Sequence, residues 1–277
     1  MTTINAPTAI QPKKKKLSPR KRAQRIRIVQ YAVLGLLVLV AVLFADGQQI
    51  VNVFFRPDLI AKALGPGLGM ALLNTVLYSI GAFIFGLVLG TVLALMKLSQ
   101  IGPYRWLATG YIEFFRGVPA IIVLLAFGLL GIAFPGLKFP LAPFGTVWTA
   151  LGMVSAAYMA ETIRAGIQAV PKGQVEAARS LGMPAGLATR YIVMPQAFRI
   201  VTPPLTNELI LLVKDSSLVY VLGLTTGAFE LTKYGREMSS TYGNLTPLIV
   251  AGFCYLLITL PLTLLVRRME ARQRKAR

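Results

Sequence analysis

The residues whose chemistry stands out are polar side chains inside long apolar runs of the chain. Lys214 and Asp215 interrupt one such run and are followed by Ser216 and Ser217. Charged residues at membrane depth are rare and usually take part in function. Counted from Pro203 at ~1.5 Å per helical residue, Lys214 lies about 16 Å into this run. Since neighbouring helix positions point apart, Lys214 and Asp215 need separate partners or a local break in the helix.

Two other apolar runs carry polar residues of the same kind. Glu161 and Arg164 are three residues apart and can pair on one helix face. Asn74 and Thr75 could line a polar path, although hydrogen bonds between helices would explain them nearly as well. These groups predict either a path or gate for a zwitterionic solute or an ion-pair network that fixes a bundle, and both roles stay open. The candidates for the path or gate are Asn74, Thr75, Glu161, Lys214, Asp215, Ser216 and Ser217.

The sequence excludes several enzyme classes. It has no His, its single Cys is Cys254, and no Lys follows a Gly. Zinc sites built on His or Cys clusters, Ser–His triads and GK[ST] phosphate loops therefore cannot form. A serine–lysine dyad of Ser216 and Lys214 would need two side chains that point apart on a helix. We expect no catalytic residue, no metal site and no cofactor in this chain.

Composition and charge indicate an integral membrane protein. Of the 277 residues 55% are hydrophobic and only 14% are charged, whereas soluble domains carry about 25% charged residues. The net charge of +19 is concentrated in residues 13–27 and 267–277. Because basic segments that flank apolar helices stay in the cytoplasm, we expect both termini inside the cell, near anionic lipid. A nucleic-acid partner is not expected.

Six apolar runs approach the ~20 residues that a membrane-spanning helix needs. They cover residues 28–45, 71–96, 116–134, 146–168, 205–227 and 246–266. The first is expected to be a retained anchor, since no clean signal-peptide cleavage site follows it. The second contains Gly86 and Gly90, a pair that allows close helix packing. Six crossings place segments 46–70, 135–145 and 228–245 outside, and the more basic segments 97–115 and 169–204 inside, which agrees with the positive-inside rule.

Segment 169–204 is too polar to span a membrane. Pro171 suits the first position of a helix, and Gly182 suits the left-handed position that ends one. Pro184 then opens a second short helix, on which Leu187 and Tyr191 share a face. The pattern predicts two short helices joined at Gly182, which either pack on the chain's own helices or bind another protein. A DNA-reading helix-turn-helix is disfavoured, because the segment is tethered to the membrane at both ends and is only weakly basic.

The same segment resembles a known signature. Glu176-Ala177-Ala178, then Gly182, then Ile192 to Gln196 match in spacing the EAA motif of permease subunits of ATP-binding-cassette (ABC) importers, with Met194 where Leu is usual. Residues 72–79, 111–123, 158–174 and 207–223 are similar to the polar amino-acid uptake branch of that family (histidine, glutamate, glutamine, arginine and opine transport). The resemblance covers about residues 68–268.

The resemblance implies a fold and a division of the chain. The fold class would be an all-α polytopic membrane protein with about six transmembrane helices: a five-helix type I ABC importer permease core plus an N-terminal anchor helix. The expected parts are a basic cytoplasmic tail (1–27), the anchor helix (28–45), an extracellular loop (46–70), the permease domain (71–268) with its coupling loop (169–204), and a second basic cytoplasmic tail (269–277).

The resemblance also implies a function and partners. The chain would form the translocation pathway of a polar amino-acid importer in the bacterial plasma membrane and work by alternating access. ATP and Mg would be bound by a separate ABC ATPase dimer; the other partners would be an extracellular substrate-binding protein and a second permease subunit, identical or different. Residues implied to couple to the ATPase are Glu176, Ala177, Ala178, Leu181, Gly182, Pro195 and Gln196.

One alternative is an ion- or proton-coupled secondary amino-acid carrier, with Lys214, Asp215 and Glu161 as relays. Such carriers are commonly built from inverted repeats, and the sequence contains no convincing repeat. The sequence leaves the substrate open among glutamate, glutamine, arginine, histidine, cystine and other amino acids.

Overall fold

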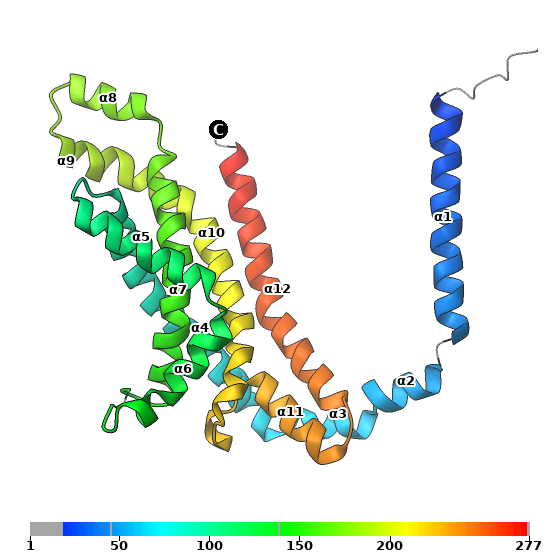
Figure 1. Cartoon of the computed structure of the whole chain (residues 1–277). Helices are drawn as coiled ribbons and strands as arrows, with labels where there is room; N and C mark the ends of the chain where they lie inside the picture. The colour runs from blue at the N-terminus through cyan, green and yellow to red at the C-terminus, as the bar shows by residue number, and fades with distance from the viewer. Residues whose placement is uncertain (1–18, 45, 138, 276–277) are drawn as a thin grey trace, which may run out of the picture. The chain divides into compact units, whose positions relative to one another are not determined.

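The computed structural model describes residues 19–44, 46–137 and 139–275 (Figure 1). Regular structure in these residues is helical, as the all-α prediction requires. The chain forms two compact units, residues 1–52 and residues 53–277. The predicted basic tails lie partly outside the described residues: the first up to residue 18, and the second at its last two residues.

The first unit consists mainly of α1 (Pro19–Phe44), a single long helix. It covers residues 28–44 of the predicted anchor span, whose last residue lies outside the described residues, and it begins earlier, at Pro19, because the basic stretch that precedes the span is rich in good helix formers. Its described side chains are all exposed within the unit. A short helix, α2 (Gly47–Phe54), follows and leads into the second unit.

The centre of the second unit is the pair α4 (Pro66–Leu98) and α7 (Phe144–Gln168). The helices touch backbone to backbone where glycines face the partner helix. A Cβ atom at Gly86 would lie 2.2 Å from the hydroxyl of Ser155, and one at Gly90 would lie 2.9 Å from the carbonyl of Ala156. The close packing predicted from this glycine pair is confirmed, and α7 is the most enclosed helix of the unit.

The fifth predicted span, 205–227, has the wrong bounds. The helical backbone runs on from α9 (Ala185–Ala188) through a π-helical turn (Thr189–Val193) into α10 (Met194–Asp215). The helix then tightens to a 3₁₀ segment (Ser216–Leu222) and ends at Gly223, whose φ is 63°. The second short helix of the predicted loop is therefore the start of α10. Of the two alternatives left open for Lys214 and Asp215, separate partners or a local break, the structure has a change from α- to 3₁₀-helix directly after them, at Ser216.

Two prolines lie inside α10 without ending it. Pro203 has no N–H to give to the carbonyl of Arg199, four residues earlier. The side chain of Gln273, near the end of α12 (Thr246–Lys275), donates a hydrogen bond to that carbonyl instead. Such a substitute donor is how helices tolerate internal proline. The two prolines, which directly precede the predicted span 205–227, therefore lie inside a helix and do not mark its start.

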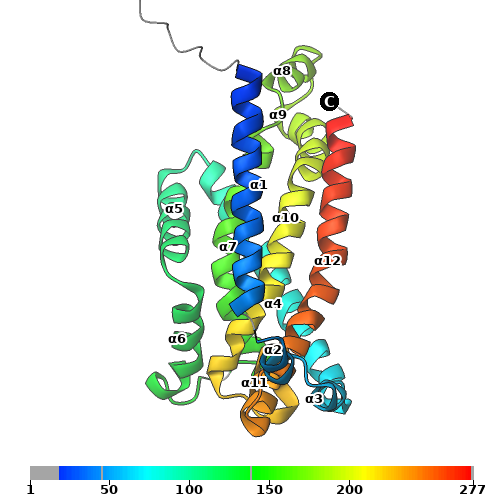
Figure 2. The same cartoon turned by 90° about the vertical axis from the view of Figure 1, so that its right-hand side faces the viewer.

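The third predicted span, 116–134, is not one straight helix. It is divided between α5 (Gly102–Gly117) and α6 (Ala120–Ala133), which meet at an angle of 103°. Figure 2 shows α5 and α6 following one another along one side of the second unit. The break lies at Val118, which is extended (ψ 130°) because a following proline disfavours helical backbone.

Helices occur at all six predicted runs, but they differ in character. By length and composition alone, α1, α4 and α12 qualify as membrane spans among the described residues, and α5 with α6 would make a fourth. Although α7 and α10 are long enough, at 25 and 22 residues, they are more polar because they face other helices. The remaining helices lie at the two ends of the second unit: α8 (Lys172–Ser180) and α9 near the C-terminus, α3 (Pro57–Ala63) and α11 (Leu231–Tyr242) at the other end (Figure 1).

Candidate functional site

A cavity of about 460 Å³ lies where the break between α5 and α6 faces α7 and α10. The break contributes residues 116–120, and α7 contributes Ser155, Tyr158 and two apolar side chains. The wall formed by α10 contains both carboxylates of the cavity, Glu208 and Asp215. The volume falls within the 300–1,000 Å³ typical of small-molecule sites.

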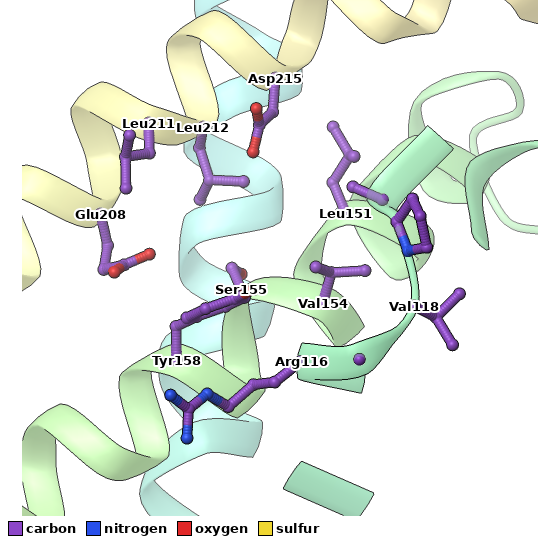
Figure 3. Close-up of a pocket in the computed structure, with 13 residues that line it drawn as sticks. Arg116, Val118, Leu151, Val154, Ser155, Tyr158, Glu208, Leu211, Leu212 and Asp215 are labelled. Atoms are coloured by element: carbon purple, nitrogen blue, oxygen red, sulfur yellow. The ribbon is translucent and has the colours of Figure 1, made fainter. Parts of the chain in front are cut away.

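Glu208 and Asp215 lie on one face of α10. They are seven residues apart, which is close to two helical turns, and Figure 3 shows both carboxylates directed into the space between α10 and α7. Among the described residues, neither carboxylate has a hydrogen-bond partner or an ion-pair partner within 4 Å. The wall is therefore acidic and its carboxylates are available to a ligand.

The opposite side of the cavity has one positive group, Arg116, at the C-terminal end of α5. Its guanidinium lies 5.7 Å from the centre of the Tyr158 ring, and Figure 3 shows the two side chains close together below the carboxylates. Arg116 likewise has no carboxylate within 4 Å among the described residues. Within the part of the chain that the structure describes, the cavity thus presents a guanidinium and two carboxylates, none of which has an ion-pair partner within 4 Å.

Of the residues predicted for a path or gate, Asp215 alone lines this cavity. Lys214 is exposed and is not part of its wall. Ser216 is fully buried, and its hydroxyl donates to the carbonyl of Val213 at 2.7 Å. Ser217 is half-buried outside the cavity wall.

Asn74 and Thr75 do not line this cavity. Both are buried, and Asn74 donates hydrogen bonds to the carbonyls of Gly227 (3.0 Å) and Phe229 (2.9 Å). The hydroxyl of Thr75 accepts one from the N–H of Leu231 at 3.1 Å. These bonds fasten the segment before α11 to α4, so the packing role weighed in the sequence is the one that the structure supports.

The fastened segment ends in a buried carboxylate, Glu230, the N-cap of α11. Its side chain accepts hydrogen bonds from the backbone N–H groups of Thr232 (2.5 Å) and Lys233 (2.7 Å) and from the Tyr255 hydroxyl (2.8 Å). Burial raises the pKa of Glu230, and these hydrogen bonds oppose the rise. Glu230 therefore caps α11, although burial disfavours the ionised form of its carboxylate.

Glu161 belongs to an ion-pair network between α4 and α7. It pairs with Arg164 at 2.7 Å, as its spacing predicted, and also with Lys97 of α4 at 2.5 Å. Arg164 in turn donates to Gln168 at 2.6 Å. Because every charged member has a partner, the network is suited to holding the two helices together.

The corner between α8 and α9 has the geometry that Gly182 predicted. Gly182 has a φ of 84°, its N–H bonds to the carbonyl of Arg179, and the N–H of Met183 bonds to the carbonyl of Ala178. This is the double hydrogen bond of a Schellman C-cap. The chain therefore reverses at Gly182 with its backbone groups satisfied.

The helix pair packs inward on one side only. Val175 and the buried Ala178 face the chain, and Val175 contacts the cluster of Val170, Val193 and Ala197. Gln196 adds hydrogen bonds to Gln174 of α8 and to the carbonyl of its own helix four residues earlier. Pro195 is exposed in the first turn of α10.

The outward side keeps apolar groups uncovered. Leu181 is 90% exposed, and Leu187 and Tyr191 are also exposed. With the exposed Glu176 and Ala177, they form what we call the coupling surface: Glu176, Ala177, Leu181, Leu187 and Tyr191. An exposed apolar patch with a polar rim is typical of a protein-binding site.

Sequence reasoning missed both Glu208 and Arg116 as site residues. The shared position of Glu208 and Asp215 could have been inferred from their spacing, since residues i and i+7 lie on the same face of a helix. The position of Arg116 could not have been inferred from the sequence, because it depends on the break at Val118, which turns the end of α5 toward α10.

Comparisons with known proteins agree with this architecture. Residues 86–275 match the family model "Binding-protein-dependent transport system inner membrane component". The chain is 41% identical to the arginine transport system permease protein ArtQ of Bacillus subtilis (68% of this chain, 83% of the relative). It is 37% identical to the glutamate/aspartate import permease protein GltK of Escherichia coli O157:H7 (73% and 91%).

Solved structures give the same result. A crystal structure titled as an amino acid ABC transporter with histidines shares 38% identity and a TM-score of 0.66, and the match covers 75% of this chain and 94% of that one. A bacterial alginate ABC transporter is similar in fold alone, at 15% identity and a TM-score of 0.65, with coverage of 91% and 98%. The chain therefore belongs to the family of binding-protein-dependent transport system inner membrane components.

Proposed function

We propose that the chain is the membrane-spanning subunit of an ABC importer for polar amino acids. The cavity between α7 and α10 receives the solute, and the coupling surface binds a separate ATPase. The observation that carries the proposal is the continuity of the helix from Ala185 to Asp215, which joins the two sites. The names of similar proteins, which include arginine and glutamate/aspartate permeases, support amino acids as the solute class.

The continuous helix gives a direct mechanical link. From Ala188 to Glu208 it spans 20 residues, or about 30 Å at 1.5 Å per residue. A shift of the coupling surface by a docked ATPase is therefore passed along one backbone to the carboxylates of the cavity. Alternating access then means that α10 moves against α7 and the break of α5, which form the other walls.

The ATPase supplies what this chain lacks. The sequence has no phosphate loop, so ATP and Mg are assigned to the partner subunit. Docking buries Leu181, Leu187 and Tyr191 and lets Glu176 meet a basic group of the ATPase, while small Ala177 permits close approach. A second permease subunit, of the same or another chain, completes the pathway, and an extracellular binding protein delivers the solute.

The coupling surface is assigned to the cytoplasmic side. Gln273, near the end of α12, lies beside the N-terminal half of α10, because its side chain donates a hydrogen bond to the Arg199 carbonyl. The basic residues of this end, Arg267, Arg268 and Arg272, favour the cytoplasm by the positive-inside rule.

A secondary carrier finds no support in the geometry. Its proposed relays do not form one pathway: Lys214 is exposed, Glu161 is held by Lys97 and Arg164, and of the three only Asp215 reaches the cavity.

The test compares two glycine substitutions in the coupling segment, assayed in proteoliposomes that contain the complete importer. Gly182→Ala places a Cβ on a residue with a φ of 84°, which costs about 1–2 kcal/mol and tilts the corner. Gly173→Ala, in α8, adds the same methyl group in open space at an ordinary φ. We expect ATP-driven uptake to fall severalfold in the first variant and to persist in the second. Uptake that needs no ATP, or that is equal in both variants, would refute the proposal.

A further inference from the structure

We propose that the basic end of α1 binds anionic phospholipids, whose phosphate groups pair with the cations that surround this helix. We call these cations the basic collar: Arg20, Lys21, Arg22, Arg25 and Arg27. The proposal goes beyond the importer function, because α1 precedes the residues that match the family model. It requires only that α1 spans a membrane, for which its length and composition qualify.

The first step is the charge of the collar. All five side chains are exposed within their unit, and residues 1–45 contain no Asp or Glu that could neutralise them. None of the five forms an ion pair among the residues that the structure describes. The collar therefore lacks a counter-charge there, and an anionic partner has the complementary charge.

The second step is the depth of the collar along α1. Residues 28–44, which follow it, carry no charge, and at ~1.5 Å per residue they extend over about 25 Å. This is close to the ~30 Å of the hydrocarbon core. When this stretch crosses the core, the collar lies in the headgroup layer, where Lys and Arg extend their charged ends toward the phosphates. Tyr31, which is 73% exposed, then lies at the interface that tyrosines favour.

The third step is the arrangement of the cations around the helix axis. At about 100° per residue, the five point in different directions and leave no gap wider than about 140°. A stripe of cations on one face would suit a groove on a protein, whereas cations on all sides suit lipids, which surround a spanning helix.

The apolar part of α1 also favours lipid over a helix partner. Close helix pairs usually have small residues four positions apart, and no such pair occurs in residues 28–44. A Cβ atom at Gly35 would meet no other atom within 4 Å.

The fourth step is the chemistry of the cations. Four of the five are arginines, and the planar guanidinium can donate two parallel hydrogen bonds to phosphate oxygens. Phosphatidylglycerol and phosphatidylcholine both carry a phosphate, but phosphatidylcholine neutralises it with its own ammonium group. A comparison of these two lipids therefore isolates the contribution of net negative charge.

The experiment measures the lipids next to the collar in the full chain, reconstituted in phosphatidylcholine nanodiscs. A fluorophore on Gln24→Cys, in a Cys254→Ala background, reports quenching by a minor fraction of acyl-labelled phosphatidylglycerol or phosphatidylcholine. The same fluorophore on Gln48→Cys is the internal control, because Gln48 is exposed beyond the other end of α1 and no cation lies between residues 28 and 55.

Two variants separate charge from side-chain identity. The collar-Gln variant replaces all five cations (Arg20→Gln, Lys21→Gln, Arg22→Gln, Arg25→Gln and Arg27→Gln). The collar-Lys variant keeps the charge at the same positions (Arg20→Lys, Arg22→Lys, Arg25→Lys and Arg27→Lys). Protease accessibility of an N-terminal tag reports the orientation of α1. If the collar-Gln chain inserts wrongly, Arg25→Gln with Arg27→Gln takes its place and leaves three collar cations.

We expect phosphatidylglycerol to be enriched at least about fivefold over phosphatidylcholine at position 24, the contribution of a single cation near the surface, and not at position 48. The collar-Lys variant should keep most of this enrichment, and the collar-Gln variant should lower it severalfold. An increase from 0.15 M to 1 M salt, which shortens the screening length from about 8 Å to about 3 Å, should lower it in the native chain.

Two results overturn the proposal. Equal quenching by the two lipids at position 24 of the native chain would show that the collar does not select anionic lipid and would leave an acidic protein as its partner. Native enrichment in a correctly oriented variant that lacks collar cations would show that these residues are not the binding site.

Discussion

Replacing Asn74 distinguishes a packing residue from a residue of the solute path. The Asn74 amide donates to two backbone carbonyls, those of Gly227 and Phe229, and its side chain is only 2% exposed. In Asn74→Leu both carbonyls lose this donor at a site closed to water. Each buried polar group left unsatisfied costs about 1–3 kcal/mol, so we expect a loss of roughly 2–4 kcal/mol after partial relaxation.

The assay is thermal unfolding of the purified importer in detergent, together with uptake kinetics. For a chain of this size each kcal/mol lowers the Tm by about 2–4 °C, so Asn74→Leu should lower it by roughly 4–16 °C. The matched control is Asn207→Leu, because Asn207 is exposed on α10, and its Tm should change little. We expect the KM for solute to stay near the native value in Asn74→Leu at permissive temperature. A native Tm with a strongly raised KM would refute the packing role and return Asn74 to the solute path.

Three further predictions concern the coupling surface, the helix contact and the buried cap. Leu181→Asp should weaken ATPase binding about tenfold or more, because the contact of one buried leucine is lost, and it should not lower the Tm of the free subunit. The control is Ser180→Asp at the adjacent exposed position, which should bind the ATPase normally in the same pull-down titration. Gly86→Ala should lower the Tm markedly, since its Cβ would lie 2.2 Å from a hydroxyl, whereas Gly69→Ala in the same helix meets open space and should not. Because the pKa of Glu230 is raised by burial, the folded state binds its proton more tightly than the unfolded state, and this residue's contribution to stability falls as pH rises above about 4.3. Chemical denaturation across pH 4–7 should show that decline in the native protein and a weaker one in Glu230→Gln; equal slopes would contradict it.

The parts of the structure that local sequence rules control were predictable. Gly182 marked the end of α8 because a left-handed C-cap depends on a few neighbouring residues. The Gly86–Gly90 contact was predictable for a similar reason, since small residues allow close packing wherever two apolar helices meet. Glu161 and Arg164 paired as their spacing indicated.

What depends on contacts between distant segments was not predictable. Pro203 and Pro204 directly precede the predicted span, but in the structure they lie inside α10, where Gln273, 74 residues from Arg199, donates the hydrogen bond that the Arg199 carbonyl would otherwise lack. The cavity could not be predicted from the sequence either, because it forms only when the break at Val118 brings Arg116 opposite Glu208 and Asp215. Asn74 was ambiguous, since an amide in an apolar run has the same sequence signal whether it binds solute or backbone.

The two prolines of α10 have a consequence for how force passes through this helix. Pro203 and Pro204 lie at its midpoint, between the half that continues from the coupling surface and the half that carries Glu208 and Asp215. Each removes one backbone hydrogen bond, so resistance to bending is lowest where the two halves join, and Gln273 restores one bond from outside the helix. We therefore expect the helix to bend most easily at the two prolines. The hydrogen bond from the end of α12 opposes this bending. In the proposed importer, the stiffness of the link between ATPase and cavity thus depends in part on a side chain that belongs to neither site.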